Sequence, residues 1–458
     1  MMILVETLLC ILFIGIAATM LFKNVNAPTV LLVLGLVMVG VSALLGITPV
    51  NVANPTGSAF FDLFKTAEER FLTSIAKLGF MIMTIGGYVS LMNRIKATDA
   101  MVYIATRPLS FFKGRPYLIS VIVIPLGMII YLTIPSASGL GLLLVSTVYP
   151  ILVGLGVSKA TALSVISAAT IFDMGPGSAN TLRASEIAGV DSVGFFIGEQ
   201  LPLIIPTTIV VMIAYYFCNR YFDRKDLAAG KQIYAEGNVN GRPDVPLFYA
   251  VFPILPLFLL IIFSPYVGIF DTRITTALAM IICMIVVLFC VLIMKRDVKD
   301  SFGLVKSFWD GMGSTFSSVV TLIVTAEIFA IGLTSLKFID LLVNGTSSVG
   351  FGAIAITALI TLTVFFSATM MGSGNAAFFS FGPMVPGIAQ MMGATTLQML
   401  VPIQLCAGMG RATSPIAAVN VAISGSVGVS PMEVARRNMI PMIIGAIFLT
   451  VTSFIINW

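Results

Sequence analysis

Residues 367–376 read SATMMGSGNA, and residues 408–415 read GMGRATSP. Both stretches lie within long apolar segments, yet they contain helix-breaking glycines, small hydroxyl side chains, an amide and one guanidinium. Inside a bilayer, irregular backbone is tolerated only where protein buries it or where it lines a cavity. The region from Ser367 to Asn420 is therefore predicted to form a binding site, with the rest of the chain as its scaffold.

The composition indicates an integral membrane protein. Of the 458 residues, 58% are hydrophobic and only 10% are charged, whereas soluble domains contain about 25% charged residues. The length suits about ten membrane-spanning helices of roughly 20 residues each. We therefore expect an all-α polytopic protein embedded in the lipid bilayer.

Several function classes are excluded by missing residues. The chain has no histidine, so it contains neither an HExxH metal site nor a Ser-His catalytic pair, and it has no GxxxxGK[ST] P-loop. An enzyme or an ATP-driven pump is therefore not expected. No basic stretch is interleaved with aromatic residues outside the apolar segments, which argues against a nucleic-acid partner. The five cysteines show no CxxC spacing and are interpreted as packing residues.

Two re-entrant helical hairpins and two broken helices are predicted. The first hairpin covers about 116–157 and is interrupted at residues 135–141, and the first broken helix covers about 158–190 and is interrupted at residues 173–180. The second hairpin covers about 350–393, and the second broken helix covers about 396–425. Between the two pairs lies the most polar segment of the chain, residues 219–245, which is predicted to be a cytoplasmic linker.

The same order of elements occurs on both sides of the linker, which predicts a repeat of residues 1–218 in residues 246–458. Chance similarity between apolar segments is the alternative. Loops rich in Lys and Arg mark the cytoplasmic side, and all of them fall on one side if the N-terminus is outside and each hairpin returns to its own side. The repeats are then inverted. Inverted repeats with interrupted helices are typical of secondary transporters whose substrate site lies near the bilayer midplane.

The interruptions are suited to binding an anion. A helix N-terminus presents unpaired N–H groups and a partial positive charge. Ser414-Pro415 has the residues favoured at a helix start, with Ser at the N-cap and Pro at the first helical position. Helices that open after Ser136, Ser178 and Gly374-Asn375 are expected to have the same character. Four converging helix starts would hold a small anion with few charged side chains.

Arg411 is the cation of the second interruption. A guanidinium near mid-membrane costs at least about 2.5–3.5 kcal/mol, so it should have a partner. Its planar fork suits a carboxylate, which predicts contact with the substrate. The alternatives are an ion pair with Asp173 and hydrogen bonds to backbone carbonyls at the interruption.

Asp173 and Glu327 are carboxyl groups within apolar segments, where charges are rare and usually functional. Each is a candidate to carry a proton or to ligate a sodium ion. For a sodium ion near Asp173, backbone carbonyls at the neighbouring interruptions, around Gly175 and Gly410, would supply further oxygen ligands. The alternative is a protonated or Arg-paired carboxyl that only braces the helices.

At these residues the sequence resembles the DcuC-type four-carbon dicarboxylate carriers, members of the wider ion transporter superfamily. The matching stretches are SASGLG at 136–141, GSGNA at 372–376 and GRATSP at 410–415, and the resemblance covers nearly the whole chain. Departures occur at Met370-Met371, where the family has threonines, and at Ala377, where it has a proline. Asp173 and Glu327 are not acidic positions associated with that family.

The resemblance implies transport of succinate, fumarate or malate across a bacterial inner membrane, coupled to protons or sodium. It also implies a homodimer in which a scaffold domain holds the partner while hairpins and broken helices move as a transport domain, in the manner of an elevator. No cofactor is expected apart from the coupling ion. The substrate residues that carry over by position are Arg411, Ser136, Ser138, Ser373, Asn375, Thr413 and Ser414. Adjoining residues of the same interruptions complete the predicted set: Gly139, Ser178, Asn180, Gly372 and Gly374.

Two alternatives keep the fold and change the cargo. One is another organic anion, and the other is a cation/proton antiporter that relies on Asp173. A channel is disfavoured because hairpins entering from both faces would block a continuous pore.

Overall fold

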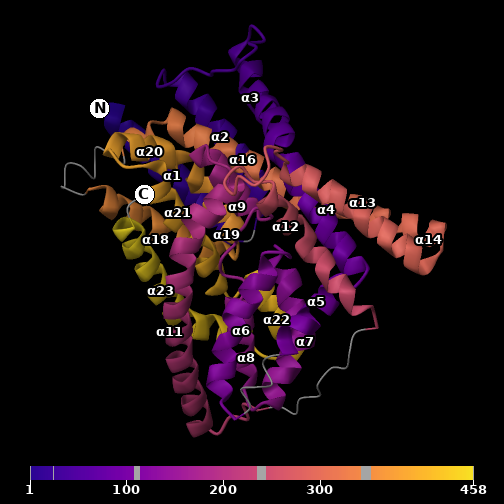
Figure 1. Cartoon of the computed structure of the whole chain (residues 1–458). Coiled ribbons are helices and arrows are strands. Elements are labelled where there is room, and N and C mark those ends of the chain that lie inside the picture. The colour runs from indigo at the N-terminus through magenta and orange to yellow at the C-terminus, as the bar shows by residue number, and fades with distance from the viewer. Residues whose placement is uncertain (1, 24, 108–113, 235–243, 342–351, 457–458) are drawn as a thin grey trace.

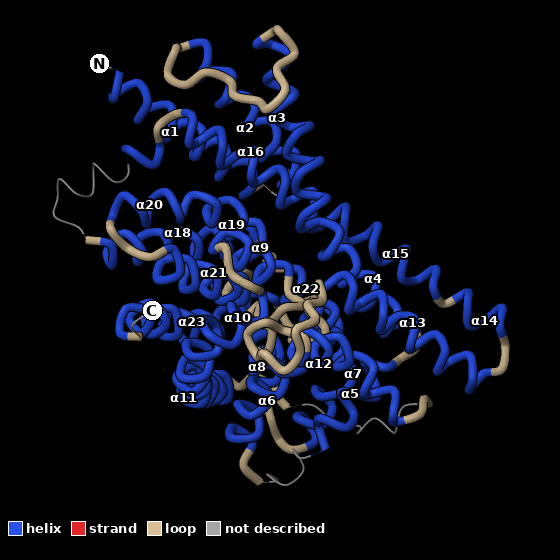
Figure 2. The backbone as a smooth tube through the Cα atoms, turned by 45° about the horizontal axis from the view of Figure 1, so that its top comes forward, coloured by secondary structure: helices blue, strands red, loops and turns tan. Residues whose placement is uncertain are grey.

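The computed structural model describes residues 2–23, 25–107, 114–234, 244–341 and 352–456, and within these ranges the chain contains helices and loops but no strand (Figure 2). The helices of the first half are α1 (Met2–Phe22), α2 (Ala27–Leu44), α3 (Ala59–Ser74), η1 (Ile75–Gly79), α4 (Phe80–Arg94), α5 (Ala97–Thr106), α6 (Pro116–Tyr131), α7 (Ala137–Gly154), α8 (Lys159–Ala168), α9 (Ala179–Ala188), α10 (Ser192–Gly194), η3 (Phe195–Gln200) and α11 (Leu201–Ala228).

The second half of the chain is also helical (Figure 1). Its helices are η4 (Leu247–Ile254), α12 (Leu255–Ile262), α13 (Thr276–Lys295), α14 (Val298–Gly303), α15 (Val305–Thr315), η5 (Phe316–Val320), α16 (Thr321–Ser335), α18 (Ala353–Met371), α19 (Gly374–Phe381), η6 (Gly382–Met384), α20 (Val385–Met392), α21 (Thr396–Ala412), α22 (Ala418–Val427) and α23 (Pro431–Ile455).

The all-helical membrane fold is confirmed, with a different count of full-length spans. In the described residues, eight helices are long and apolar enough to cross a membrane, where about ten were predicted, and four shorter apolar helices have 10–17 residues. The count is lower because several apolar helices are shorter than 18 residues. Pro116–Tyr131 and Ala418–Val427 are two of these short helices.

Two continuous helices are much longer than a bilayer needs. Ala59–Arg94 has 36 residues and Val298–Ser335 has 38, which corresponds to about 54–57 Å at 1.5 Å per residue. Each contains one π-helical segment, η1 at Ile75–Gly79 and η5 at Phe316–Val320. The two π segments touch each other in the middle of the molecule. Such segments are rare and occur frequently at functional sites.

The long helices pack through glycines. A methyl group added at Gly35 of α2 would lie 2.7 Å from the carbonyl of Ile328 in α16, and one added at Gly311 of α15 would lie 2.7 Å from the carbonyl of Gly86 in α4. Small residues let membrane helices approach closely enough for tight backbone packing. We call α1, α2, α3–α4, α13 and α14–α16 the long-helix layer, which crosses Figure 2 diagonally.

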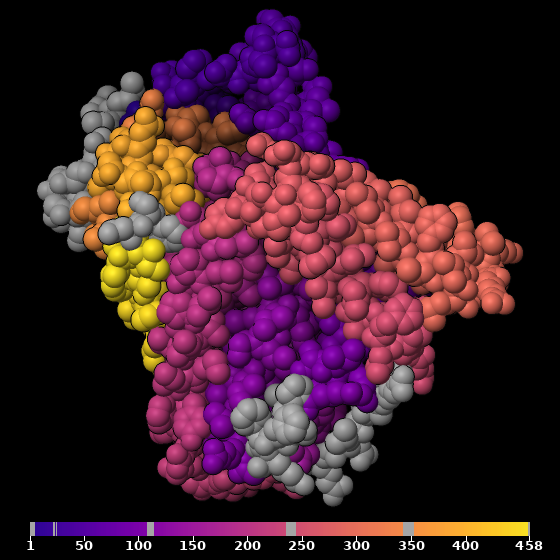
Figure 3. All heavy atoms as spheres, in the orientation of Figure 1, coloured from indigo at the N-terminus to yellow at the C-terminus, as the bar shows by residue number. Residues whose placement is uncertain are grey.

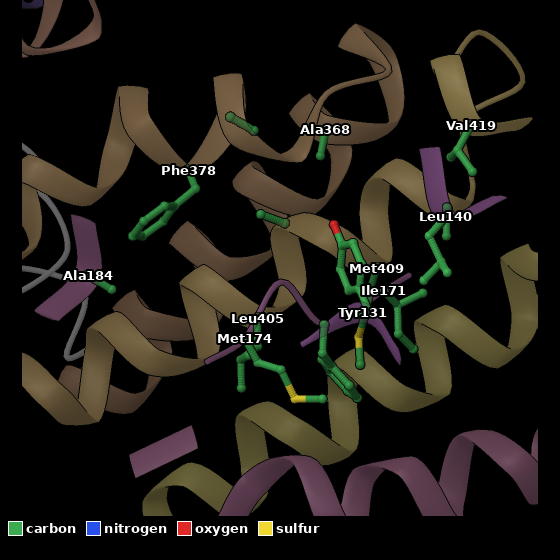
Figure 4. Packing of buried hydrophobic residues seen from close by; sticks show 14 of the residues in the cluster. Tyr131, Leu140, Ile171, Met174, Ala184, Ala368, Phe378, Leu405, Met409 and Val419 are labelled. Atoms are coloured by element: carbon green, nitrogen blue, oxygen red, sulfur yellow. The ribbon is translucent and has the colours of Figure 1, made fainter. Parts of the chain in front are cut away.

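The remaining large group of helices is the broken-helix bundle, which comprises α6–α11 and α18–α23. Its centre is a continuous apolar core, part of which is shown in Figure 4 with Tyr131, Ile171 and Met409 contributed by three different elements. On the face shown in Figure 3, residues of α11 run along one side of this bundle, and α13 and α14 project away from it. The two bodies touch where α16 passes α19.

A buried ionic cluster ties three helices of the bundle together. Arg437 of α23 has no exposed surface, and its guanidinium donates to Asp223 at 2.7 Å and Asp226 at 2.7 Å in α11, to Thr161 at 3.0 Å in α8 and to Glu433 at 3.1 Å. All three nitrogens of the guanidinium are therefore hydrogen-bonded. The cluster makes α8, α11 and α23 one rigid unit.

Each of the four predicted interrupted segments contains helices separated by a non-helical break, α6–α7, α8–α9, α18–α19 and α21–α22. Two local expectations were wrong. Residues 219–228 are not part of a loop, because α11 continues as helix to Ala228. The helix after the second interruption begins at Ala418 rather than at Ser414-Pro415. There the Ser414 hydroxyl accepts a hydrogen bond from the Ile416 N–H at 3.3 Å, which forms a short turn in place of a helix cap.

Candidate substrate site

The four interruptions are in contact with one another. In the first pair, Gly175 has φ of +87°, and a methyl group there would lie 2.6 Å from Leu132 at the tip of the α6–α7 hairpin. In the second pair, Gly372 at the tip of the α18–α19 hairpin lies against Ala417, with 3.1 Å between an added methyl group and the Ala417 backbone. Left-handed glycines allow these close approaches.

A cavity of about 640 Å³ opens where the interruptions meet the long-helix layer. We call it the tip cavity, because residues 135–137 at the first hairpin tip line it. From the broken-helix bundle it receives Tyr131, Pro135, Ser136, Ala137, Asp173, Gly177, Ala179, Asn375 and Arg411. From α4, α15 and η5 it receives Ile82, Ile85, Gly86, Val89, Ser90, Asn93, Asp310, Gly311, Ser314, Thr315, Ser318 and Val319. Its volume lies within the usual range for small-molecule sites, about 300–1,000 Å³.

Arg411 reaches across from the second broken helix to the first. Its Nη2 donates to the backbone carbonyl oxygen of Thr170, and the Thr170 hydroxyl lies 3.4 Å from the same nitrogen. No salt bridge joins Arg411 to Asp173 among the described residues, while the buried Nε has no hydrogen-bond acceptor there. The backbone carbonyl alternative is therefore realised, and the guanidinium keeps unused donor capacity at the cavity wall.

Asp173 is the buried carboxyl of the first interruption, with 6% of its surface exposed. Its Oδ1 accepts a hydrogen bond from the Ser178 hydroxyl at 2.5 Å, and its side chain lines the tip cavity. Ser178 in turn caps α9 by accepting from the Thr181 N–H at 3.2 Å. The carboxylate is thus fixed by the cap of the following helix while one side faces the cavity.

Side-chain amides satisfy the irregular backbone at both interruptions. Gln404 donates to the Asp173 carbonyl oxygen at 2.8 Å, and Gln200 accepts from the Gly175 N–H at 3.2 Å. At the other interruption, Asn420 and Asn438 both donate to the Ala412 carbonyl oxygen, at 2.9 and 2.7 Å. Buried polar backbone must be paired, because an unpaired group costs about 1–3 kcal/mol. These amides pair the backbone groups of the interruptions, so the side chains of Asp173 and Arg411 are not needed for that purpose.

Four residues of the predicted set line the tip cavity: Ser136, Asp173, Asn375 and Arg411. The other predicted substrate residues do not line it. Ser373 caps α19, Thr413 donates to the Gly410 carbonyl oxygen, and Ser414 is fully buried. Residues Ser138, Gly139, Asn180, Gly372 and Gly374 belong to the same interruptions but do not line the cavity wall. The buried Oδ1 of Asn180 has no hydrogen-bond donor among the described residues.

The carbonyl oxygens suggested for a sodium ion are engaged in this conformation. The Gly410 oxygen accepts from Thr413 at 2.7 Å and Thr369 at 3.1 Å, and the Gly175 oxygen accepts from the Ser178 N–H at 3.0 Å. Within the described ranges, no cluster of three or more Cys, Asp or Glu side chains is arranged to hold a metal ion. These carbonyl oxygens therefore already accept hydrogen bonds from the protein in this conformation.

Glu327 lies away from the tip cavity. Its Oε1 is 2.8 Å from Nη2 of Arg183, and its Oε2 accepts from the Ser74 hydroxyl at 2.9 Å. Arg183 also pairs with Glu186 at 2.6 Å. Glu327 is thus paired with an arginine in this structure, and both groups line a separate cavity.

The sequence interpretation missed the wall supplied by the long-helix layer. Asp310, Ser314 and Ser318 are spaced four residues apart and line the tip cavity together, as do Gly86 and Ser90 of α4. Residues at i and i+4 lie on one helix face. These polar residues, spaced along one face of an apolar helix, could have predicted which face of the helix lines the cavity.

Solved structures with a similar fold are transporters. The chain aligns with the crystal structure of the Alcanivorax borkumensis YdaH transporter at a TM-score of 0.59 and 17% identity, covering 94% of this chain and 99% of that one. It aligns with Neisseria gonorrhoeae MtrF, described with a class of antimetabolite efflux pumps, at a TM-score of 0.60 and 12% identity, covering 96% and 97%. The chain therefore shares the helical membrane fold of these two proteins.

The particular family follows from sequence. The chain belongs to the DcuC family of C4-dicarboxylate anaerobic carriers, whose profile matches residues 5–457. It is 28% identical to the anaerobic C4-dicarboxylate transporter DcuC of Escherichia coli K12 over 451 residues, which are 98% of this chain and 96% of that protein. It is 29% identical to a probable transporter of the same name from Vibrio cholerae over 437 residues, 95% and 94% of the two chains. The family consists of transporters, not enzymes.

Proposed function

We propose that this protein carries C4-dicarboxylates such as succinate, fumarate and malate across the bacterial inner membrane, coupled to sodium ions or protons. The family supports a C4-dicarboxylate transporter. The observation that carries the substrate site is the position of Arg411 in the wall of the tip cavity, with donor capacity left over after its bond to Thr170. A guanidinium is suited to bidentate binding of a carboxylate.

The charges of the tip cavity support coupling to a cation. One cation, Arg411, and two carboxylates, Asp173 and Asp310, line it. With ordinary ionisation the wall carries one net negative charge, so an entering dianion would meet repulsion at low local dielectric. A cation that binds with the dianion, or a proton on one carboxyl, removes this repulsion. Asp173 is our candidate for the residue that binds this cation or proton, because it is buried and lines the same cavity as Ser136 and Arg411.

The two bodies support an elevator-type alternating access. The long-helix layer is packed through close glycine contacts, and the broken-helix bundle is tied by the Arg437 cluster and by the amides at the interruptions. Cavities lie along the boundary between the layer and the bundle. We infer that the layer is the scaffold and that the bundle moves past it, carrying the interruptions and the substrate. The matching element order supports two inverted repeats with re-entrant hairpins.

The assembly and orientation follow from the same proposal. The N-terminus would lie outside, the linker at 219–245 in the cytoplasm, and two copies would associate through their scaffolds. Many exposed apolar side chains of α13, including Leu278, Ile282 and Phe289, give this layer a surface suited to lipid or to a second copy. Cross-linking of single-cysteine variants in native membranes tests both the pairing and the side on which each loop lies.

Transport by purified protein in liposomes tests the function. We expect saturable counterflow of labelled succinate, competition by fumarate and malate, and accumulation when a sodium or a proton gradient is imposed. Each gradient is applied alone, so that the coupling ion is identified. Absence of counterflow together with absence of competition by every C4-dicarboxylate would contradict the substrate assignment, and competition by another carboxylate or by a drug-like anion would redirect it. Counterflow also separates a carrier from a channel.

A further inference from the structure

A second cavity, of about 480 Å³, lies at another part of the boundary between the two bodies. We call it the Lys77 cavity. Its wall comes from α2, α3, η1 and α16 of the long-helix layer and from α9 of the broken-helix bundle. The polar residues that line it are Thr48, Asn51, Thr66, Arg70, Thr73, Ser74, Lys77, Arg183, Glu186, Glu327, Thr334, Ser335 and Lys337. It shares no lining residue with the tip cavity.

Lys77 occupies an unusual position for a charged residue. It lies in η1, at the middle of the 36-residue helix Ala59–Arg94. The part of that helix before Lys77 is strongly charged, with five charged residues from Asp62 to Arg70, whereas the residues from Leu78 to Asn93 are uncharged. Lys77 therefore lies near one end of the apolar part of the helix, where a charged side chain facing a cavity often marks a substrate or ion path. Its side chain is exposed to the cavity.

The wall of the Lys77 cavity has excess positive charge. Four cations, Arg70, Lys77, Arg183 and Lys337, face two carboxylates, Glu186 and Glu327, which leaves two net positive charges. Both carboxylates pair with Arg183, at 2.6 and 2.8 Å. In the described part of the chain no ion pair is recorded for the other three cations. Arg183 itself is 7% exposed, and its buried Nε lacks an acceptor.

The two cavities carry net charges of opposite sign, although each is lined by the third residue of a π segment. Lys77 is the third residue of η1 and lines the Lys77 cavity, whereas Ser318 is the third residue of η5 and lines the tip cavity. The tip cavity is lined by one cationic side chain and two carboxylates, whereas the Lys77 cavity is lined by four cationic side chains and two carboxylates. Without an added cation, a dianion is therefore attracted to the Lys77 cavity and repelled from the tip cavity.

We propose that the Lys77 cavity is a second binding site for a small dicarboxylate, distinct from the site at the interruptions, with Lys77 as its principal ligand. Arg70 and Lys337, which line the same cavity, contribute further positive charge. The choice of ligand rests on the proposed function, whereas the position and sign of the site rest on the cavity itself. Because the site needs no partner cation, its affinity for the dianion is independent of the coupling ion.

Equilibrium binding of labelled succinate to the purified full-length protein tests this site. The wild-type protein is expected to bind two succinates per chain, and Lys77→Gln to bind one. In the Arg411→Gln background one succinate remains bound, independently of sodium, and adding Lys77→Gln removes it. Lys299→Gln is the matched control, because Lys299 is an exposed lysine of the same layer that lines neither cavity.

The outcomes separate the two proposals. One succinate per wild-type chain, lost in Arg411→Gln and kept in Lys77→Gln, overturns the Lys77 site and leaves the proposed function intact. No binding of succinate, fumarate or malate to the wild-type protein overturns both. Thermal unfolding of each variant is followed in parallel, and the Lys77→Gln result in the wild-type background stands even if Arg411→Gln does not fold.

Discussion

Gly408 and Ile171 are in backbone contact where the two broken helices cross, since a methyl group at Gly408 would lie 1.8 Å from the Ile171 carbonyl oxygen. Gly408→Ala is therefore expected to destabilise the protein by about 1–3 kcal/mol, as overpacking does, and to abolish transport by separating the interruptions. Gly425→Ala is the control: Gly425 lies in α22 with nothing within 4 Å, so a gain of up to about 1 kcal/mol is expected. Thermal unfolding and succinate uptake measure both variants.

Arg411→Lys keeps the charge and removes the planar fork. A lysine cannot both bond the Thr170 carbonyl and present two parallel donors to a carboxylate. With about 1.5–3 kcal/mol for a hydrogen bond to a charged group, we expect the apparent affinity for succinate to fall about 10- to 100-fold. Uptake kinetics in liposomes give this number. An unchanged affinity would show that Arg411 serves only the backbone of the first interruption.

Asp173→Asn removes the charge while keeping an oxygen that can accept from Ser178. If Asp173 carries the coupling cation, succinate binding persists but its dependence on sodium or pH disappears. The thermal shift caused by succinate, about 2.7 kcal/mol at 100 times the dissociation constant, reports binding under each ionic condition. A loss of stability with ion dependence retained would assign Asp173 to bracing instead.

Asp310→Asn removes a carboxylate from the exposed wall of the tip cavity. Because Asp310 repels an entering dianion and has no recorded ion pair in the described ranges, its neutralisation is expected to strengthen succinate affinity several-fold at low salt. The gain should shrink as ionic strength rises, since the Debye length falls from about 30 Å at 0.01 M to about 8 Å at 0.15 M. A weaker affinity would indicate that Asp310 holds a cation needed for binding.

Arg437→Leu breaks the buried cluster that joins α8, α11 and α23. Leaving Asp223 buried without its cation is expected to cost about 3–5 kcal/mol. Arg436→Leu is the matched neighbour, because its side chain is 40% exposed and surface pairs contribute at most about 1 kcal/mol. Unfolding monitored in detergent compares them. Equal effects would contradict the role of the cluster as the tie within the bundle.

Local sequence signals were sufficient for the interruptions. Glycines with positive φ at Gly175 and Gly372, and serine caps at Ser136 and Ser178, form where breakers and small hydroxyls stand in apolar sequence. The helix start predicted at Ser414-Pro415 was wrong because a side chain six residues further along stabilises a different local structure. Asn420 donates to the Ser414 carbonyl oxygen at 2.8 Å, which stabilises an open turn there.

The walls of the cavities could not be predicted in the same way, because they depend on contacts between segments far apart in the sequence. Glu327 meets Arg183 from another helix, and Arg437, which marks a basic loop in the sequence, is fully buried against Asp223 and Asp226. Hydrophobic periodicity does not predict the π segments either. Burial and pairing of a charge depend on which helices pack together, and that information is not local.

Among the ion pairs recorded in the described ranges, that of Arg183 and Glu327 alone joins the two bodies. On the proposed sliding motion, separating these side chains raises the free energy of every conformation in which the bundle has moved. Each 1.4 kcal/mol of that coupling changes the ratio of the two conformations about tenfold. Replacing Glu327 is therefore expected to change the ratio of the two conformations while leaving the cationic residues of both cavities in place.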